Sequence, residues 1–271
     1  MTGFRRILSF RNPPIQAVID ANLIQKFLGF LQRTDFTKLQ FEATWCITNI
    51  ASGSSDNCQA LIDKGTINLL VQLLNSSDAE VVEQAIWGLG NIAGDNTGFR
   101  NLVIDAGAVN PIANILDHSE PGSTLTRNAS WSLSNLCRNH PCPDYSLVKR
   151  AVPSLARVLL HEANTETVLD ICWAFSYLSD GGEERIPDIL STSIQAKLMD
   201  LLKDPKVGIV IPSMRTIGNL VTGTDETTQM LIDMGLIRLL DELSTHQSKM
   251  VRKEVCWTIS NITAGTPEQI A

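Results

Sequence analysis

The sequence predicts an all-α fold, a solenoid of repeated helical units, because two phrases recur along the chain with one period. The first carries Trp followed four residues later by Asn, as in WGLGNIAGD, and its copies begin at Trp45, Trp87, Trp131, Trp173, Arg215 and Trp257. The intervals are 42, 44, 42, 42 and 42 residues. The second phrase centres on Asp20, Asp63, Asp105, Lys149, Ser191 and Asp233, at intervals of 43, 42, 44, 42 and 42. A sustained period of this length indicates a repeat architecture, whatever the total length.

Each unit of about 42 residues predicts a short helix, a turn at Gly, a second helix, a polar turn and a long third helix carrying the Trp. Without strand alternation, this pattern selects an armadillo- or HEAT-type solenoid, in which each unit buries its apolar face against its neighbours. We expect one domain over residues 1–271 with about six repeats. The last phrase stops where another repeat should begin, so we also expect a fragment of a longer protein.

The third helices are expected to end at residues that tolerate a left-handed conformation. Eight residues after each Trp or Arg215 stand Gly53, Asp95, Asn139, Gly181, Gly223 and Gly265. Glycine and, less often, Asn or Asp adopt this conformation after helices.

Composition argues against several classes of function. The net charge of −7 disfavours general binding to nucleic-acid backbones and favours basic partners. No apolar run is long enough for a membrane span, and the N-terminus does not resemble a signal peptide. The sequence therefore predicts an intracellular protein.

The six cysteines are too few for a disulfide scaffold in a chain of this length. Cys46, Cys172 and Cys256 adjoin a repeated Trp, and we expect them to be reduced and buried. The segment CRNHPC brings Cys137, His140 and Cys142 close in sequence but lacks a fourth ligand, so we expect an inter-repeat loop and no metal site.

The repeated Trp and Asn share one face of the third helix, because position +4 lies about 40° and position −3 about 60° from the Trp. Position −3 is mostly polar: Glu42, Gln84, Asn128, Asp170, Pro212 and Glu254. One interpretation is structural, with Trp packed between repeats and Asn bonded to a neighbouring backbone. The other is a binding face, in which indoles about 8–10 Å apart hold the aliphatic stems of Lys or Arg, acids attract their charged ends, and Asn amides bond to an extended peptide.

With these phrases in view, essentially the whole chain resembles the importin-alpha (karyopherin-alpha) family, armadillo adaptors that bind nuclear localisation signals. The resemblance implies a right-handed superhelical solenoid with two peptide sites on a concave groove. The larger set of site residues, by this resemblance, is Trp45, Asn49, Gly53, Cys58, Gln84, Trp87, Asn91, Asp95, Asn128, Trp131, Asn135, Asp170, Trp173 and Tyr177. The smaller set is Arg215, Asn219, Val221, Gly223, Asp225, Thr228, Glu254, Trp257 and Asn261.

The resemblance also covers two irregularities of the repeat, since the family interrupts its Trp–Asn phrase between its two sites. Tyr177 and Arg215 are such interruptions here. Cys58 is a departure, because the family places Thr in the lysine pocket and a thiol is a weaker hydrogen-bonding group. The implied partners are basic cargo proteins, and the implied localisation is cytoplasm and nucleus. The family's importin-beta-binding segment and its last repeats are not found in this sequence, so we expect an open cargo-binding core.

Three other classes of function fit less well. A beta-catenin-like scaffold would have a basic groove for acidic segments, whereas Glu42, Asp95, Asp170, Asp225 and Glu254 make this face acidic. An enzyme using Cys137 and His140 would need a third orienting group in a dry pocket, which the sequence does not indicate. Nucleic-acid binding is disfavoured because basic residues do not cluster along the Trp positions. We expect neither catalysis nor a cofactor.

Overall fold

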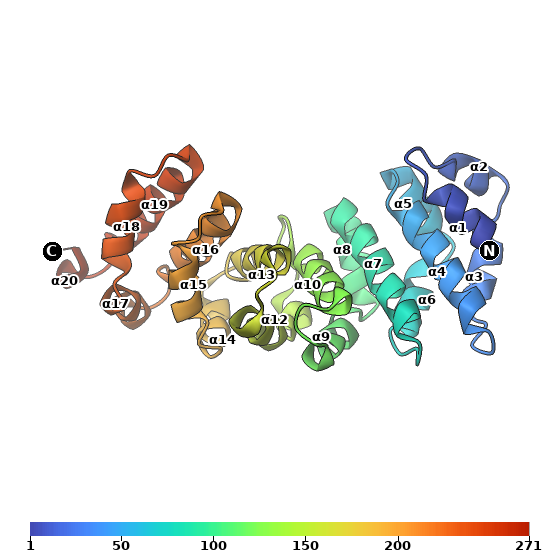
Figure 1. Cartoon of the computed structure of the whole chain (residues 1–271). Coiled ribbons are helices and arrows are strands. Elements are labelled where there is room, and N and C mark those ends of the chain that lie inside the picture. Colours follow the sequence, from blue (N-terminus) through green and yellow to red (C-terminus); the bar gives the residue numbers. More distant parts are fainter. Residues whose placement is uncertain (271) are drawn as a thin grey trace. The chain divides into compact units, whose positions relative to one another are not determined.

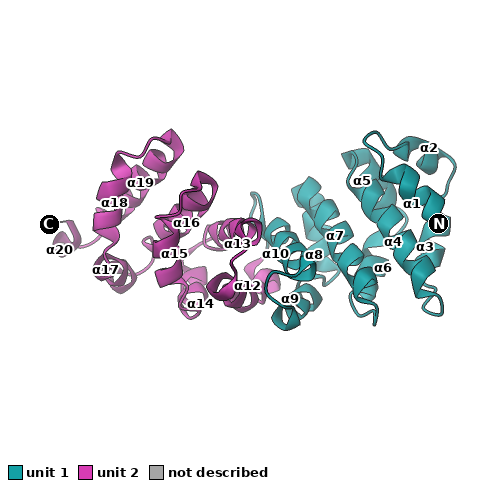
Figure 2. Cartoon of the chain, viewed as in Figure 1, with its two compact units in different colours: residues 1–143 teal, residues 144–271 magenta. Residues whose placement is uncertain are grey.

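The computed structural model describes residues 1–270, and every regular element in that range is a helix (Figure 1). By compactness the chain divides into two units, residues 1–143 and 144–271, coloured separately in Figure 2. Among the described helices, none combines the length and apolar composition that crossing a membrane requires.

The first unit contains an initial helix and three complete three-helix repeats. The initial helix is α1 (Thr2–Leu8). The repeats comprise α2 (Ile15–Asp20), α3 (Ile24–Leu31) and α4 (Thr37–Ala51), then α5 (Ser55–Ile62), α6 (Thr66–Leu73) and α7 (Ala79–Asp95), then α8 (Thr97–Asp105), α9 (Val109–His118) and α10 (Thr124–Cys137).

The second unit continues the same order. Its repeats comprise α11 (Tyr145–Val148), α12 (Ala151–His161) and α13 (Thr165–Leu178), then a 3₁₀ turn η1 (Glu183–Arg185) with α14 (Ile186–Leu190), α15 (Gln195–Leu201) and α16 (Val207–Leu220), then α17 (Asp225–Asp233), α18 (Leu236–Ser244) and α19 (Lys249–Ile262). A short helix, α20 (Pro267–Ile270), follows. The predicted succession of two helices and a long third helix is therefore confirmed six times.

The third helices form the core of each unit. In the first unit α4 packs against α7 and α7 against α10, and in the second unit α13 packs against α16 and α16 against α19. Apolar side chains on both sides of these helices are fully buried, including Ile47, Ile86, Leu89 and Leu133. Each repeat thus buries its apolar surface against the next.

In three repeats, a polar residue in the turn before the third helix caps the N-terminus of that helix. The Asp78 carboxylate accepts from the backbone N–H groups of Glu80 and Val81. Ser123 and Asn164 serve α10 and α13 in the same way. These caps satisfy N–H groups that have no partner within the helix.

The prediction that a left-handed residue ends each third helix is wrong at five of the six positions. Only Asn139 has a positive φ, of 71°. Asp95 is the last residue of α7, and at Gly53 and Gly223 the backbone is not left-handed. A Cβ on Gly53 would lie 2.4 Å from Asn57 Oδ1 and 2.9 Å from Ile15 Cδ1, and a Cβ on Gly223 would lie 3.0 Å from Ile186 Cδ1. Space therefore explains these two glycines. Gly65, Gly107 and Gly235, at the predicted turn between first and second helices, have positive φ angles, as do Gly122 and Gly182 elsewhere in the described chain.

The prediction of buried cysteines is confirmed for Cys46 and Cys172 and wrong for Cys256, which is exposed. The position before the repeated Trp is buried wherever another third helix follows, as at Cys172 and Met214. No third helix follows α19 within the described residues, so Cys256 has no such neighbour.

Candidate peptide-binding faces

In the first unit, three consecutive third helices carry the Trp–Asn pairs Trp45/Asn49, Trp87/Asn91 and Trp131/Asn135, which we call the Trp–Asn ladder. The Trp87 side chain is 40% exposed, and Trp45 and Trp131 are half-buried. Because Trp and Asn four residues apart lie on one face, each helix presents an indole beside an amide. The ladder therefore combines apolar surface with hydrogen-bonding groups.

Each Asn also bonds to the preceding repeat. Asn91 Nδ2 donates to the Thr48 carbonyl at 3.2 Å, and Asn135 Nδ2 donates to the Gly90 carbonyl at 3.1 Å. An amide has two N–H donors and an acceptor oxygen, so one such bond leaves hydrogen-bonding capacity unused. The structural interpretation of Asn is thus confirmed without excluding the binding interpretation.

The first Trp of the ladder contacts a helix that the sequence interpretation overlooked. The Arg5 guanidinium of α1 lies 4.6 Å from the centre of the Trp45 ring, and Arg5 Nε donates to Glu42 Oε2 at 2.7 Å. Asn49 Nδ2 donates to Ser9 Oγ at 3.1 Å. Arg5 and Ser9 are themselves four residues apart, so RRILS is a degenerate copy of the Trp–Asn phrase, and this spacing could have identified it.

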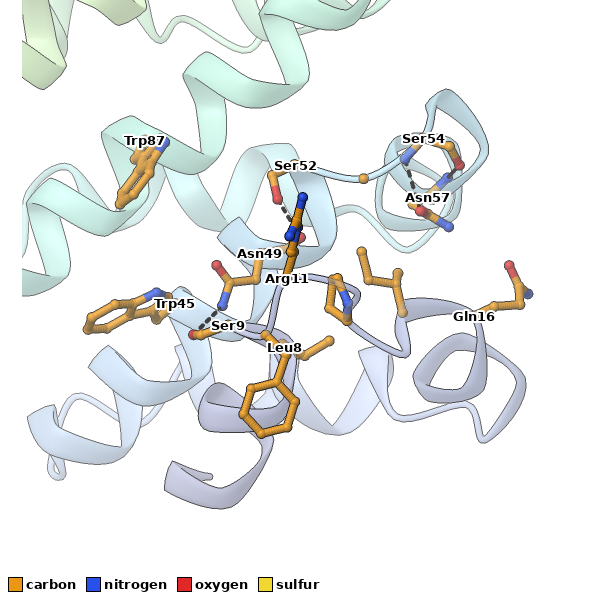
Figure 3. Close-up of a pocket in the computed structure, with 14 residues that line it drawn as sticks. Leu8, Ser9, Arg11, Gln16, Trp45, Asn49, Ser52, Ser54, Asn57 and Trp87 are labelled. Atoms are coloured by element: carbon orange, nitrogen blue, oxygen red, sulfur yellow. Dashed lines mark hydrogen bonds between the residues drawn. The ribbon is translucent and has the colours of Figure 1, made fainter.

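A pocket of about 720 Å³ opens beside these residues, where α1 and the loop after it meet the C-terminal end of α4 (Figure 3). Of the larger set, it is lined by Trp45, Asn49, Gly53 and Trp87. The lining residues missed in the sequence are Leu8, Ser9, Phe10, Arg11, Pro13, Ile15, Gln16, Ser52, Ser54 and Asn57.

Asp95 lies at the C-terminal end of α7 and faces the start of α5. Its Oδ1 accepts from Ser55 Oγ at 2.9 Å and its Oδ2 accepts from Asn96 Nδ2 at 2.8 Å. Both donors are neutral, so they do not compensate the negative charge of Asp95. A carboxylate accepts more than two hydrogen bonds, so an ammonium group can still be accommodated.

Cys58 faces the protein interior. Its side chain is 1% exposed, and its thiol donates to the Ala51 carbonyl at 3.2 Å. Burial, with a smaller contribution from the Asp95 charge, raises the pKa of the Cys58 thiol to about 11. Thr228 makes the equivalent bond, donating to the Val221 carbonyl at 3.1 Å. The structure therefore gives Cys58 the same local role as Thr228.

Gln84 on α7 and Asn128 on α10 stand three residues before Trp87 and Trp131. Gln84 is buried, and its Oε1 has no hydrogen-bond partner among the described residues. Asn128 Nδ2 donates to Glu83 Oε1 at 3.0 Å. Glu83 is an acid that the sequence interpretation missed because it examined position −3 and not −4. Burial raises the pKa of the Glu83 carboxyl, opposed by the charge of Arg127.

The remaining members of the larger set, Asp170, Trp173 and Tyr177, lie on α13 in the second unit. The rings of Trp173 and Tyr177 stack with centroids 5.8 Å apart and an interplanar angle of 24°. Tyr177 thus covers one face of Trp173 where other repeats have Asn. Their participation in the larger site stays a prediction.

The smaller set forms two neighbouring pockets within the second unit. A pocket of about 260 Å³ is lined by Arg215, Asn219, Glu254 and Trp257, together with Asp180 and Lys253, which the sequence interpretation missed. A second pocket of about 220 Å³ is lined by Val221, Thr222, Gly223, Asp225, Thr228, Asn261, Ala264 and Gly265. The two pockets therefore account for every residue of the smaller set.

Arg215 repeats the arrangement of Arg5. Its Nε donates to Glu254 Oε2 at 2.6 Å, and its guanidinium lies 5.8 Å from the centre of the Trp257 ring. Hydrogen bonding to Glu254 raises the pKa of Arg215. Two of the five acids expected to make the face acidic, Glu42 and Glu254, are therefore paired with arginines of the chain itself.

Within residues 1–270, no cluster of three or more His, Cys, Asp or Glu side chains is placed to hold a metal ion. In the loop 138–143, Cys142 Sγ lies 3.5 Å from His140 Nδ1. The buried Arg100 organises this loop: its guanidinium donates to the carbonyls of Arg138, Asn139 and Pro141.

Comparison with known proteins places this arrangement in context. The armadillo/beta-catenin-like repeat model matches residues 11–52, 54–94, 96–138 and 224–264. Importin subunit alpha-1a of Oryza sativa subsp. japonica is 46% identical over 99% of this chain and 51% of its own length. Importin subunit alpha-B of Dictyostelium discoideum is 46% identical over 82% of this chain and 43% of its own length. The chain thus spans about half the length of these relatives.

Solved structures with the same fold include designed proteins. An engineered protein matches with a TM-score of 0.89 and 27% identity, covering 99% of this chain and 65% of its own. A designed armadillo repeat protein in complex with the peptide (KR)4 matches with a TM-score of 0.76 and 25% identity, covering 88% of this chain and 98% of its own. The chain belongs to the armadillo/beta-catenin-like repeat family, and importin alpha subunits are its homologues.

Proposed function

We propose that this chain binds Lys/Arg-rich segments of partner proteins in extended conformation and acts as the cargo-binding part of a nuclear import adaptor. The Trp–Asn ladder of α4, α7 and α10 is the observation that carries this proposal. Its indoles, exposed at Trp87 and half-buried at Trp45 and Trp131, suit aliphatic stems and cationic heads. The hydrogen-bonding capacity that the Asn amides do not use between repeats suits a peptide backbone.

The larger set would form the principal site, with Asp95 receiving a lysine. Its negative charge has only neutral donors around it, so a cationic partner would complete its environment. The smaller set would form a second site, in which Asp225 and the carbonyls near Val221 and Gly223 surround a basic side chain. Support comes from the importin alpha homologues and from the (KR)4 peptide bound by a designed relative.

The relatives further imply importin-beta as a partner of the whole protein and shuttling between cytoplasm and nucleus. Armadillo adaptors act by binding, and the proposal assigns no catalytic residue, cofactor or metal to this chain. Neither nucleic acid nor membrane is among the proposed direct partners.

The test is a titration of the chain with a fluorescently labelled Lys/Arg-rich peptide and, as control, an acidic phosphopeptide of equal length. The proposal expects saturable binding of the basic peptide and none of the acidic one at the same salt concentration. Preference for the acidic peptide would instead indicate a scaffold for acidic segments.

A further inference from the structure

The pocket beside Trp45 has a charge opposite to that expected of a site for basic peptides. Of the 14 described residues that line it, Arg11 alone is charged. Arg11 is exposed and has no carboxylate partner among the described residues. In Figure 3 its side chain extends towards the C-terminal end of α4, beside Ser52 and Asn49. A guanidinium without a counter-charge thus lies at the first Trp–Asn pair of the ladder.

A second arginine, Arg5, changes the electrostatics around Trp45, the first Trp of the ladder. Arg5 lies over the Trp45 ring and is paired with Glu42, which is 6% exposed. The charge of Glu42 is therefore compensated within the protein, and the α1 side of the indole is covered by the protein's own cation. A peptide lysine gains nothing by extending past Trp45 in this direction.

The other polar groups of the pocket are neutral donors or acceptors. Ser54 caps α5, its Oγ accepting from the Asn57 backbone N–H, and Ser9 Oγ accepts from Asn49. Asp56 on α5 and Asp95 on α7 do not line the pocket, and neither does Asp20, whose Oδ1 accepts from the side chain of the lining Gln16 at 2.8 Å. The Arg11 guanidinium is therefore the one charged group among the lining residues.

We propose that this Arg11 pocket binds an anionic group that flanks the basic cluster of a peptide, so that it determines specificity next to the principal site. The inference rests on the proposed function. An extended peptide advances about 3.3 Å per residue, so the anion would lie within a few residues of the last basic side chain on the Trp45 face. The pocket thereby distinguishes a basic cluster followed by an acid from an uninterrupted basic run.

The experiment measures affinities for one basic cluster flanked by Glu, Ala or Lys at each of three positions on either side. Wild-type chain should prefer Glu to Ala on one flank by about twofold to fivefold, the range for partly exposed ion pairs, and the preference should shrink with added salt. Arg11→Ala should abolish it, and Arg11→Glu should favour Lys. Two further comparisons identify the anion that binds best. One replaces Glu with phosphoserine at the preferred position, and the other compares peptides with a free and an amidated C-terminus.

Arg6→Ala is the matched control, because Arg6 is exposed, adjacent in sequence to Arg5 and absent from the pocket lining. It should retain the Glu preference. Equal affinities for Glu and Ala at every position, or a Glu preference that survives Arg11→Ala, would overturn this inference while basic-peptide binding persists. Absence of any basic-peptide binding would overturn the proposed function and this inference together.

Discussion

The indole of Trp131 packs directly against the backbone of Gly90 on the neighbouring helix. A Cβ on Gly90 would lie 2.4 Å from Cζ3 of Trp131, closer than real contacts allow. Gly218 and Trp257 have the same relationship, also at 2.4 Å. A glycine three residues after Trp87 or Arg215 therefore sets how closely the next repeat's indole approaches.

Gly90→Ala should displace the Trp131 ring and weaken basic-peptide binding. Overpacking of this kind costs about 1–3 kcal/mol, so the melting temperature should also fall. Gly29→Ala is the matched control, since Gly29 lies within α3 and nothing occupies the space of its Cβ within 4 Å. That variant should be at least as stable as wild type, because alanine favours helix. Wild-type affinity and stability for Gly90→Ala would refute the packing argument.

Asp95→Lys should reduce basic-peptide affinity by at least about tenfold, or about 1.4 kcal/mol, because the charge that attracts a lysine is reversed. The loss should persist at moderate salt if the bound lysine is partly desolvated. Asp63→Lys makes the same charge change at an exposed residue at the end of α5 and should have little effect. Equal affinities of the two variants would place the principal lysine pocket elsewhere.

Glu83→Gln should change the pH dependence of stability. Burial raises the pKa of the Glu83 carboxyl, so the folded state holds this proton more tightly than the unfolded state. Wild-type stability should therefore fall as pH rises from the ordinary Glu pKa through the raised one. The glutamine side chain of the variant keeps an oxygen that can accept from Asn128. Measured by urea unfolding, the variant should be more stable than wild type at pH 7 but not at pH 4. Exposed Glu120→Gln should not reproduce this difference; if it does, burial of Glu83 is not the cause.

Two separable sites are expected because the phrase is complete at Trp45, Trp87 and Trp131, changes at Tyr177 and Arg215, and returns at Trp257. Trp257→Ala should lower the affinity of a two-cluster peptide towards that of a one-cluster peptide, because one of two linked binding events is then lost. If the affinity does not change, this chain has no second site.

The helical repeat could be predicted from the sequence because its evidence is periodic. Each Trp marks a long third helix, and each IDxG phrase marks the left-handed turn after a first helix, as at Gly65 and Gly235. The role of the glycines at the ends of the third helices could not be predicted, because the space around Gly53 and Gly223 is limited in part by Ile15 and Ile186, which are distant in sequence. The single domain and the right-handed superhelix stay predictions.

The candidate site was predicted only where it follows the repeat. The Trp and Asn positions of the ladder were identified by phase and the smaller set by the resemblance to importin-alpha, whereas Arg5 belongs to a degenerate phrase without Trp and Arg11 follows that phrase. Pairing of Glu42 with Arg5 also escaped prediction, because residue spacing does not reveal which charges meet in space. From the sequence, the Asn residues of the Trp–Asn ladder have either a structural or a binding role, although one amide can serve both.

The most direct test of the central claim is calorimetric titration of a Lys/Arg-rich peptide into wild-type chain and into the Trp87→Ala, Asn91→Ala double variant. Trp87 is 40% exposed, so its loss should affect binding far more than folding. The account predicts at least about a tenfold loss of affinity, equivalent to about 1.4 kcal/mol, with a melting temperature lowered by only a few degrees. Unchanged affinity in a folded double variant would contradict it, because the Trp–Asn ladder would then be structural alone.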